Sequence, residues 1–310
     1  MPLFRQTIIR DNLERRARII DGVRTFFRDA GFLEVETPVR IPAPLPEAHI
    51  DTQPAGDWYL QPSPELTMKR LLAAGYPRIF QICRCFRQGE RGSRHLPEMT
   101  LLEWYASQAD YQTLMQQCEE LVAFLVRCLR KGHSADNWLT FQSQIVDLTP
   151  PWDRLSVTDA FHRFGRMTVA DALERDCFDE VMGIDIEPQL GLDRPVFLID
   201  YPAQCGSLAR RKADDPSVVE RFELYIAGME LCNAFSELAD PVEQRERFEA
   251  ENRLREAAGK TVYPAAEPFL SALVHMPPAA GIALGIDRLV MLLLDAGGID
   301  EVVAFTPEEL

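Results

Sequence analysis

Five arginines lie close together between residues 78 and 94 of this 310-residue chain. They are Arg78, Arg84, Arg87, Arg91 and Arg94, and the one acid among them is Glu90. Five cations and one anion give the segment a net charge of +4, whereas the whole chain carries −15. Guanidinium groups bind phosphate and carboxylate through paired hydrogen bonds. The segment is therefore a candidate clamp for a triphosphate, and a solvated charged loop is the alternative.

An acidic stretch comes later in the chain, where residues 214–256 hold twelve acids and five bases. Within it Glu223, Glu230 and Glu237 recur every seven residues, and the last two stand in an otherwise apolar run. On an ideal strand an odd separation places two side chains on opposite faces, unless a bulge intervenes. Buried acids need a cation or a metal beside them, so these acids suggest bound Mg²⁺ or a substrate ammonium. Two acids paired with neighbouring arginines are the alternative.

A third segment, Gly281-Ile-Ala-Leu-Gly-Ile-Asp-Arg288, joins a glycine-containing strand to an apolar helix that ends at Gly297. Gly285 allows the backbone to approach a ligand closely. Arg288 stands in the first turn of the expected helix, where a cation opposes the helix dipole. That unfavourable placement hints at an anionic partner.

The elements that must position these residues form a mixed pattern of helices and strands. Apolar spacing predicts helices over residues 12–30, 65–74, 111–130, 218–226 and 241–258. Strands are predicted over residues 32–37, 79–87, 98–105, 196–200, 229–238 and 281–285, with residues 88–96 as a hairpin loop. Residues 42–64 are proline-rich and predict loops and edge strands, and residues 133–195 resemble an insertion of loops and short helices. We expect one α+β domain over residues 1–310, with a mainly antiparallel sheet flanked by helices.

Several common sites are missing from the sequence. It has no G-x-x-x-x-G-K-[ST] and no G-x-G-x-x-G that opens a helix, which disfavours P-loop and Rossmann nucleotide sites. The apolar run at residues 121–129 is broken by Arg127, and residues 1–18 lack the apolar core of a signal peptide, so we expect no membrane association. Seven cysteines without a C-x-x-C pair fit reduced thiols in the cytoplasm. The charge of −15 disfavours a dedicated nucleic-acid binder.

The three segments, in this order, resemble the motifs of the class II aminoacyl-tRNA synthetases. Residues 12–38 resemble motif 1, which forms dimers, F-R-Q-G-E-R-G-S-R-H-L-P-E-M-T-L-L-E-W-Y (86–105) resembles motif 2, and residues 281–288 resemble motif 3. Ser63-Pro64-Glu65, residues 221–238 and the following D-P-V-E-Q-R are similar to the lysyl branch. The resemblance covers nearly the whole chain and implies the class II catalytic fold and a homodimer.

Length separates two groups within that branch. A lysyl-tRNA synthetase carries an anticodon-binding domain before motif 1, and motif 1 here begins within the first 40 residues. The chain therefore resembles the short paralogous family, the elongation factor P–lysine ligases, and Ala283 stands where that paralogue has alanine and lysyl-tRNA synthetases have glycine. The resemblance implies activation of (R)-β-lysine with ATP as an adenylate. It also implies transfer to a lysine ε-amine of elongation factor P, without tRNA.

The resemblance also implies roles for single residues. Arg87 would contact the α-phosphate and the substrate carboxylate, Arg288 would hold the far phosphate, and both are the expected catalytic residues. Glu223 and Glu230 would hold Mg²⁺ on the phosphates, and Glu230 would also contact ATP. The other expected ATP contacts are Gly89, Glu90, His95, Leu96, Met99, Leu231 and Gly285. The expected contacts with the amino acid are Ser63, Glu65, Glu103, Tyr105, Asn233, Glu237 and Ala283.

The sequence departs from the family pattern at three of these positions. Gly89 stands where motif 2 usually has a glutamate, so Glu90 or a backbone group would take over its contact. Leu96 replaces an asparagine that is common near ATP, and Met99 replaces a phenylalanine that stacks on adenine.

Three other functions fit parts of the pattern. A minimal lysyl-tRNA synthetase would act on tRNA, which the acidic charge disfavours. A non-catalytic regulatory subunit would lose its ATP and Mg²⁺ residues, yet Arg87, Glu223, Glu230 and Arg288 are all present. An enzyme that makes an amide metabolite from a free amino acid is the third.

Overall fold

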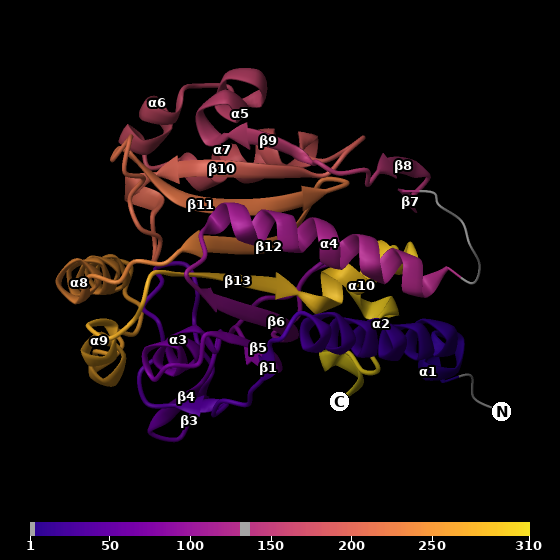
Figure 1. Cartoon of the computed structure of the whole chain (residues 1–310), viewed down its shortest axis with the longest axis horizontal. Helices are drawn as coiled ribbons and strands as arrows, with labels where there is room; N and C mark the ends of the chain where they lie inside the picture. The colour runs from indigo at the N-terminus through magenta and orange to yellow at the C-terminus, as the bar shows by residue number, and fades with distance from the viewer. Residues whose placement is uncertain (1–3, 131–136) are drawn as a thin grey trace.

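An eight-stranded sheet crosses the middle of the molecule (Figure 1). The computed structural model describes residues 4–130 and 137–310. The outermost pairs, β1 with β5 and β9 with β10, are parallel, and the five pairs between them are antiparallel. The strands lie in the order β1 (Leu33–Glu34), β5 (Arg78–Phe86), β6 (Glu98–Ser107), β13 (Ala279–Gly285), β12 (Met229–Ser236), β11 (Val218–Ile226), β10 (Val196–Pro202) and β9 (Asp153–Ser156).

Three helices cover one face of the sheet, and α2 and α4 run side by side across it (Figure 1). They are α2 (Arg10–Asp29), α4 (Tyr111–Leu129) and α10 (Ile286–Leu294). The core between them and the sheet is aromatic, because the ring of Phe27 lies 5.0 Å from the rings of Phe80 and Trp104. Each such pair adds stabilisation beyond the apolar area that it buries.

The opposite face carries a second core under α3 (Glu65–Ala73), α5 (Val157–Phe164) and α9 (Glu267–Leu273). Successive side chains of a strand point to opposite faces, so Trp104 enters the first core and Tyr105 the second. Glu103 is two residues from Tyr105 and shares its face. The predicted acidic contacts of β6 therefore lie on the side of the sheet away from α2 and α4.

Side-chain caps fix where two of the helices begin. The carboxylate of Asp110 accepts the N–H of Thr113 at 2.9 Å at the start of α4. At the start of α8 (Pro241–Ala257) Asp240 accepts the N–H groups of Val242 and Glu243. Such caps satisfy backbone donors that have no partner within the helix. The cap at Asp240 and the proline after it confirm the start that the sequence predicts.

Shorter elements fill the space around the sheet. A small sheet of β2 (Arg40–Ile41), β3 (Pro54–Ala55) and β4 (Trp58–Leu60) occupies the proline-rich segment. Further elements are α1 (Arg5–Ile8), the hairpin of β7 (Trp138–Phe141) and β8 (Gln144–Asp147), α6 (Val169–Glu174) and α7 (Phe178–Val181). No helix within the two described ranges is long and apolar enough to cross a membrane. All seven cysteines are free thiols, as expected from their spacing.

The sequence prediction is wrong at residues 218–226, which form strand β11 and not a helix. The strand pairs with β10 on one side and with β12 on the other, and most of its residues are buried. A central strand buried on both faces loses the polar–apolar alternation that marks an exposed strand. Apolar residues then recur at helical spacing by chance, as Val219, Phe222 and Ile226 do here.

Two other segments differ from expectation in part. The strand predicted over residues 32–37 is reduced to the two residues of β1, which pair with Ile79 and Phe80, and Pro38, which has no backbone N–H to donate, lies beyond the end of the pairing. Of the segment 133–195, residues 133–136 lie outside the described residues. The rest contains short helices as expected, but its strand β9 extends the main sheet beside β10.

Candidate active site

Two rows of side chains cross the middle of the sheet on the face of the second core. One row is Glu103, Ala283, Asn233 and Glu223, and the other is Tyr105, Gly281, Phe235 and Arg221. Residues that stand opposite one another on paired strands project to the same side. The register of four strands therefore gathers residues that are far apart in the sequence.

A bulge decides where Glu230 points. Leu224 pairs with Cys232 but Tyr225 pairs with Glu230, so Leu231 is an extra residue in β12. The extra residue turns the side chain of Glu230 to the same face as Asn233. The sequence left this open, because Glu230 and Glu237 are an odd number of residues apart.

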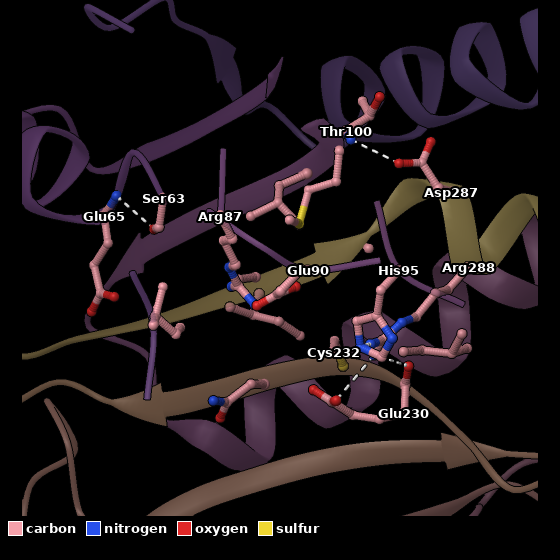
Figure 2. Close-up of a pocket in the computed structure, with 18 of the residues that line it drawn as sticks. Ser63, Glu65, Arg87, Glu90, His95, Thr100, Glu230, Cys232, Asp287 and Arg288 are labelled. Atoms are coloured by element: carbon pink, nitrogen blue, oxygen red, sulfur yellow. Dashed lines mark hydrogen bonds and ion pairs between the residues drawn. The ribbon is translucent and has the colours of Figure 1, made fainter. Parts of the chain in front are cut away.

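A cavity of about 300 Å³ lies on this face of the sheet (Figure 2). Ser63 and Glu65 lie at one end of the view, His95, Glu230 and Arg288 at the other, and Arg87 and Glu90 between them. Of the predicted site residues, those that line it are Ser63, Glu65, Arg87, Glu90, His95, Leu96, Met99, Tyr105, Glu230, Leu231, Asn233, Ala283, Gly285 and Arg288. Those that do not line it are Gly89, Glu103, Glu223 and Glu237.

The acidic end of the cavity is built on hydrogen bonds to Glu103. The Ser63 hydroxyl donates to Glu103 Oε1 at 2.6 Å, and the Tyr105 hydroxyl donates to Glu103 Oε2 at 2.8 Å. Burial, and then the neighbouring carboxylate of Glu65, raise the pKa of Glu103 to about 8. Glu103 therefore orients Ser63 and Tyr105 from behind the wall rather than facing the cavity itself.

Glu237 lies behind the same wall and has a free oxygen. Its Oε1 is buried and accepts no hydrogen bond among the described residues, although it lies beside Gly281 and Tyr105, which line the cavity. A Cβ on Gly281 would stand 2.2 Å from the Tyr105 ring and 2.4 Å from that oxygen, so only glycine fits there. A buried acceptor without a donor is costly, and an ammonium group is the donor that suits a carboxylate.

Arg87 stands between the two ends of the cavity. Its Nε is buried and donates no hydrogen bond among the described residues, and its Nη1 lies 3.7 Å from Glu90 Oε1. A free guanidinium donor at this position fits a phosphate or carboxylate oxygen. Gly89 has a φ of +80° and lets the loop turn, so that Glu90 rather than Gly89 reaches the cavity.

Only part of the arginine-rich segment lines the cavity. Arg87 and Arg94 line the cavity, whereas Arg84 pairs with Glu98 and Arg91 pairs with acids near the C-terminus. Acids from other parts of the chain thus offset much of the local charge of +4. Arg78 is also away from the cavity, with a long hydrogen bond to a backbone carbonyl on another element.

The cationic end is formed by Arg288 and the side chains around it. Arg288 Nη1 donates to Glu230 Oε2 at 3.0 Å, and its Nη2 contacts His95 Nε2 (Figure 2). Burial, and then the charge of Arg288, lowers the pKa of His95, so the imidazole stays neutral and can accept from the guanidinium. Asp287 faces away from this contact and accepts the N–H of Thr100 at 2.8 Å.

The two acids expected to hold Mg²⁺ lie near each other, but each already has a partner. Glu223 accepts from Arg221 Nη2 and from the Tyr225 hydroxyl, each at 2.7 Å, while Glu230 pairs with Arg288. Glu187 lies close enough that both raise its pKa to about 7 after the larger effect of burial. Within residues 4–130 and 137–310, no group of three His, Cys, Asp or Glu side chains could hold a metal by itself.

Two charged residues of the wall were not singled out from the sequence. Arg221 lines the cavity and would have been found had β11 been predicted as a strand, since residues 221 and 223 then share a face. Glu47 lines it from the proline-rich loop, and burial raises its pKa to about 7 despite the opposing effect of Arg87. No local sequence signal marks Glu47.

Comparison with known proteins agrees with this geometry. Residues 1–309 match the family described as tRNA synthetases class II (D, K and N). The chain is 41% identical to an elongation factor P–(R)-β-lysine ligase of Edwardsiella ictaluri, with 95% of this chain and 94% of that protein covered. It is 40% identical to the protein of that name from Hamiltonella defensa, with 96% and 95% covered. It is 39% identical to a lysine–tRNA ligase of Moorella thermoacetica, over 94% of this chain and 64% of that protein.

The match extends over the three motifs and over nearly the whole of the two ligases. The mainly antiparallel sheet with helices on its faces is the architecture expected from the motifs. The chain therefore belongs to the class II tRNA synthetase family (D, K and N) and, within it, to the group that includes the elongation factor P–(R)-β-lysine ligases.

Proposed function

We propose that this protein activates (R)-β-lysine with ATP as an adenylate and transfers the acyl group to a lysine ε-amine of elongation factor P. The observation that carries the proposal is the polarity of one continuous cavity. Carboxylates surround one end and arginines the other, with Arg87 between them. A diamino acid joined to a phosphate has the complementary distribution of charge, with ammonium groups at one end and phosphate at the other.

The acidic end suits the ammonium groups of the amino acid. Glu65 lines the cavity, and Glu237 Oε1 is a buried acceptor without a donor among the described residues. The Tyr105 hydroxyl and Asn233 add polar contacts on the same face of the sheet. Ala283 stands between Asn233 and Glu103 in the register, so its methyl group reduces the space for the substrate backbone.

The cationic end suits ATP, and charge stabilisation is its chemical contribution. A carboxylate oxygen of the amino acid bonds to the α-phosphorus, and the bond to the pyrophosphate oxygen breaks. Arg87 offsets the negative charge that builds on the α-phosphate during this displacement, and Arg288 binds the phosphates beyond it. The acceptor amine then bonds to the acyl carbon, AMP leaves with the electron pair of the broken bond, and the amine loses a proton.

Glu223 and Glu230 would hold Mg²⁺ beside the phosphates. Their donor set is oxygen only, and Mg²⁺ prefers one or two carboxylates together with substrate phosphates and water. The ion would supply positive charge to the phosphate oxygens. For this the carboxylate of Glu230 must exchange its contact with Arg288 for the ion, which frees that guanidinium for a phosphate.

The first test is pyrophosphate exchange that depends on the amino acid. We expect exchange with (R)-β-lysine, weaker exchange with α-lysine, and subsequent transfer of labelled (R)-β-lysine to purified elongation factor P. The free thiols fit a reducing location such as the cytoplasm, so the assay contains a reductant. Arg87→Ala should abolish exchange, because the α-phosphate loses its cation. Arg84→Ala is the matched control, since Arg84 lies on β5 three residues before Arg87 but pairs with Glu98 outside the cavity. Exchange with neither isomer would contradict the proposal.

A minimal lysyl-tRNA synthetase is the second candidate, and the similarity to a lysine–tRNA ligase favours it. A lysyl-tRNA synthetase would also catalyse lysine-dependent pyrophosphate exchange, so only the identity of the acceptor separates the two functions. Charging of tRNA at low salt, without modification of elongation factor P, would support the synthetase.

A further inference from the structure

Lys69 is a buried cation behind the acidic end of the cavity. It lies on α3, one turn after Glu65, and only 1% of its side chain is exposed. Its ammonium group contacts Glu65 Oε1 and lies 2.5 Å from Glu237 Oε2. An isolated buried charge is strongly unfavourable, so this lysine requires both carboxylates.

The contacts of Lys69 leave one oxygen free on each carboxylate. Glu65 lines the cavity while Lys69 does not, so the lysine approaches Glu65 from the side away from the ligand space. Lys69 forms an ion pair with Oε2 of Glu237. The other oxygen, Oε1, lies beside Tyr105 and Gly281 and accepts no hydrogen bond among the described residues. The two free oxygens therefore remain available to a bound molecule.

Charge at this end of the cavity shows why such a cation is needed. Glu65, Glu103 and Glu237 lie close enough together that each raises the pKa of a neighbouring group. For Glu103 and Glu237 burial is the largest cause of the raised pKa, and the nearby carboxylates add to it. Carboxyl groups that crowd together retain protons, and a protonated carboxyl cannot pair with an ammonium. The charge of Lys69 opposes this effect, because it lowers the pKa of Glu237.

We propose that Lys69 is a positioning residue that pairs with one oxygen of Glu65 and one of Glu237 and leaves the other oxygen of each to the two ammonium groups of the substrate. The proposal rests on the proposed function, because it takes the substrate to be a diamino acid. Burial alone would lower the pKa of Lys69, but Glu237 and Glu65 outweigh it and raise the pKa. The lysine therefore stays charged while the substrate binds and leaves.

The test compares the binding of ATP with that of lysine in Lys69→Met, which keeps the length of the side chain but removes its charge. Calorimetry is carried out separately with ATP, α-lysine and (R)-β-lysine between about pH 6.5 and about pH 9. We expect ATP to bind as in the wild type, and the affinity for lysine near neutral pH to fall about tenfold or more. The affinity should recover as the pH rises, because without Lys69 the carboxyl of Glu237 ionises only at a higher pH.

Two further variants separate this function from a structural one. Lys212→Met removes a lysine whose ammonium group lies 2.7 Å from the carboxylate of Asp200. Neither residue lines the cavity, so this variant should change neither the affinity for lysine nor its pH profile. Lys69→Arg keeps the charge and should retain the wild-type pH profile of lysine binding. If Lys69→Met fails to fold, Lys69→Arg decides: a folded variant that binds ATP but not lysine would overturn the proposal.

The outcomes also distinguish the two proposals. If the wild-type protein binds ATP but neither lysine isomer, the substrate is not lysine, and the proposed function is wrong. If the wild type binds lysine and Lys69→Met binds it equally at every pH, the function of Lys69 is wrong and the proposed activity stands. A loss of ATP and lysine binding together, with no change in pH profile, would assign Lys69 a structural function only.

Discussion

Glu103 and Glu237 are acids in surroundings that disfavour their charged form. Burial raises the pKa of each to about 8 from an ordinary value of 4.5. Between these two values the folded protein holds protons that the unfolded chain has lost. Their contribution to stability is therefore complete below about pH 4.5 and is lost as the pH rises toward 8.

The first prediction is that the ligand-free protein becomes less stable between about pH 5.5 and about pH 8. Urea denaturation at both pH values measures it, and the loss should amount to a few kcal/mol. Glu103→Gln should reduce the slope, because the amide does not titrate. Glu98→Gln, on the same strand but in an exposed surface pair, is the control. Equal slopes in all three proteins would show that the buried carboxyls are already ionised.

Residue types in the sequence predict the side chains that line the cavity better than the buried side chains that hold them in place. Arg87, Glu230 and Arg288 follow from charge in an unexpected place, and the structure brings all three to one cavity. Lys69 does not, since a lysine one turn after a glutamate is the pattern of an exposed helix pair. Its burial depends on the packing of α3 against the sheet, which no local pattern shows.

At the scale of elements, α8 holds a loop of the cavity wall in place. Arg255 of α8 is 1% exposed, donates to the carbonyls of Glu47 and Ile50 at 2.7 and 2.8 Å, and pairs with Asp51 at 2.7 Å. Glu47 and Ile50 both line the cavity. The helix therefore sets the position of a wall that comes from a distant part of the sequence.

The second prediction is that Arg255→Met destabilises the protein by about 3–5 kcal/mol, because it leaves buried acceptors without a donor. It should also weaken substrate binding, since the loop that carries Glu47 loses its anchor. Arg245→Met on the same helix removes an exposed pair with Glu267 and should change the stability far less. Chemical denaturation and calorimetry measure both effects, and similar costs for the two variants would contradict the importance of the anchor.

The elements themselves were predictable where local chemistry decides them. The cap at Asp240 fixes the start of α8, and Gly31, just after α2, has a left-handed φ of +77°, which glycine adopts without strain. Strand β11 was not predictable from periodicity, because it is buried on both faces. A signal was nevertheless present: Ala227 and Gly228, both with positive φ, form a two-residue turn between two apolar runs.

At the scale of the whole molecule, charge is separated rather than merely acidic. The chain carries −15, yet Arg87, Arg94, Arg221 and Arg288 all line one cavity. An acidic exterior repels the backbone of nucleic acids, while the cavity attracts the phosphates of a small molecule. Net charge predicts the first property, and the second depends on the fold that gathers these arginines.

Assembly is the remaining property at this scale, and the resemblance to motif 1 predicts a homodimer. Several large apolar side chains near the N-terminus are exposed in the single chain, among them Ile8 on α1 and Leu33 on the edge strand β1. Exposed apolar residues at a sheet edge favour pairing with a second copy. Their burial between two copies would also make stability depend on protein concentration.

The third prediction is a sedimenting mass of about twice 35.2 kDa for the wild type at micromolar concentration. The double variant Ile8→Asp, Leu33→Asp should sediment as a monomer, because burying two unpaired carboxylates between the copies is unfavourable. Ile145→Asp is the matched control, since Ile145 is 65% exposed on β8, outside the predicted interface, and the variant should remain a dimer. If the wild type sediments as a monomer, the predicted interface does not exist. If the double variant stays dimeric, the interface lies elsewhere on the surface. The cavity is formed by one chain, so a folded monomer that still binds ATP would show that the dimer supports stability and not the site itself.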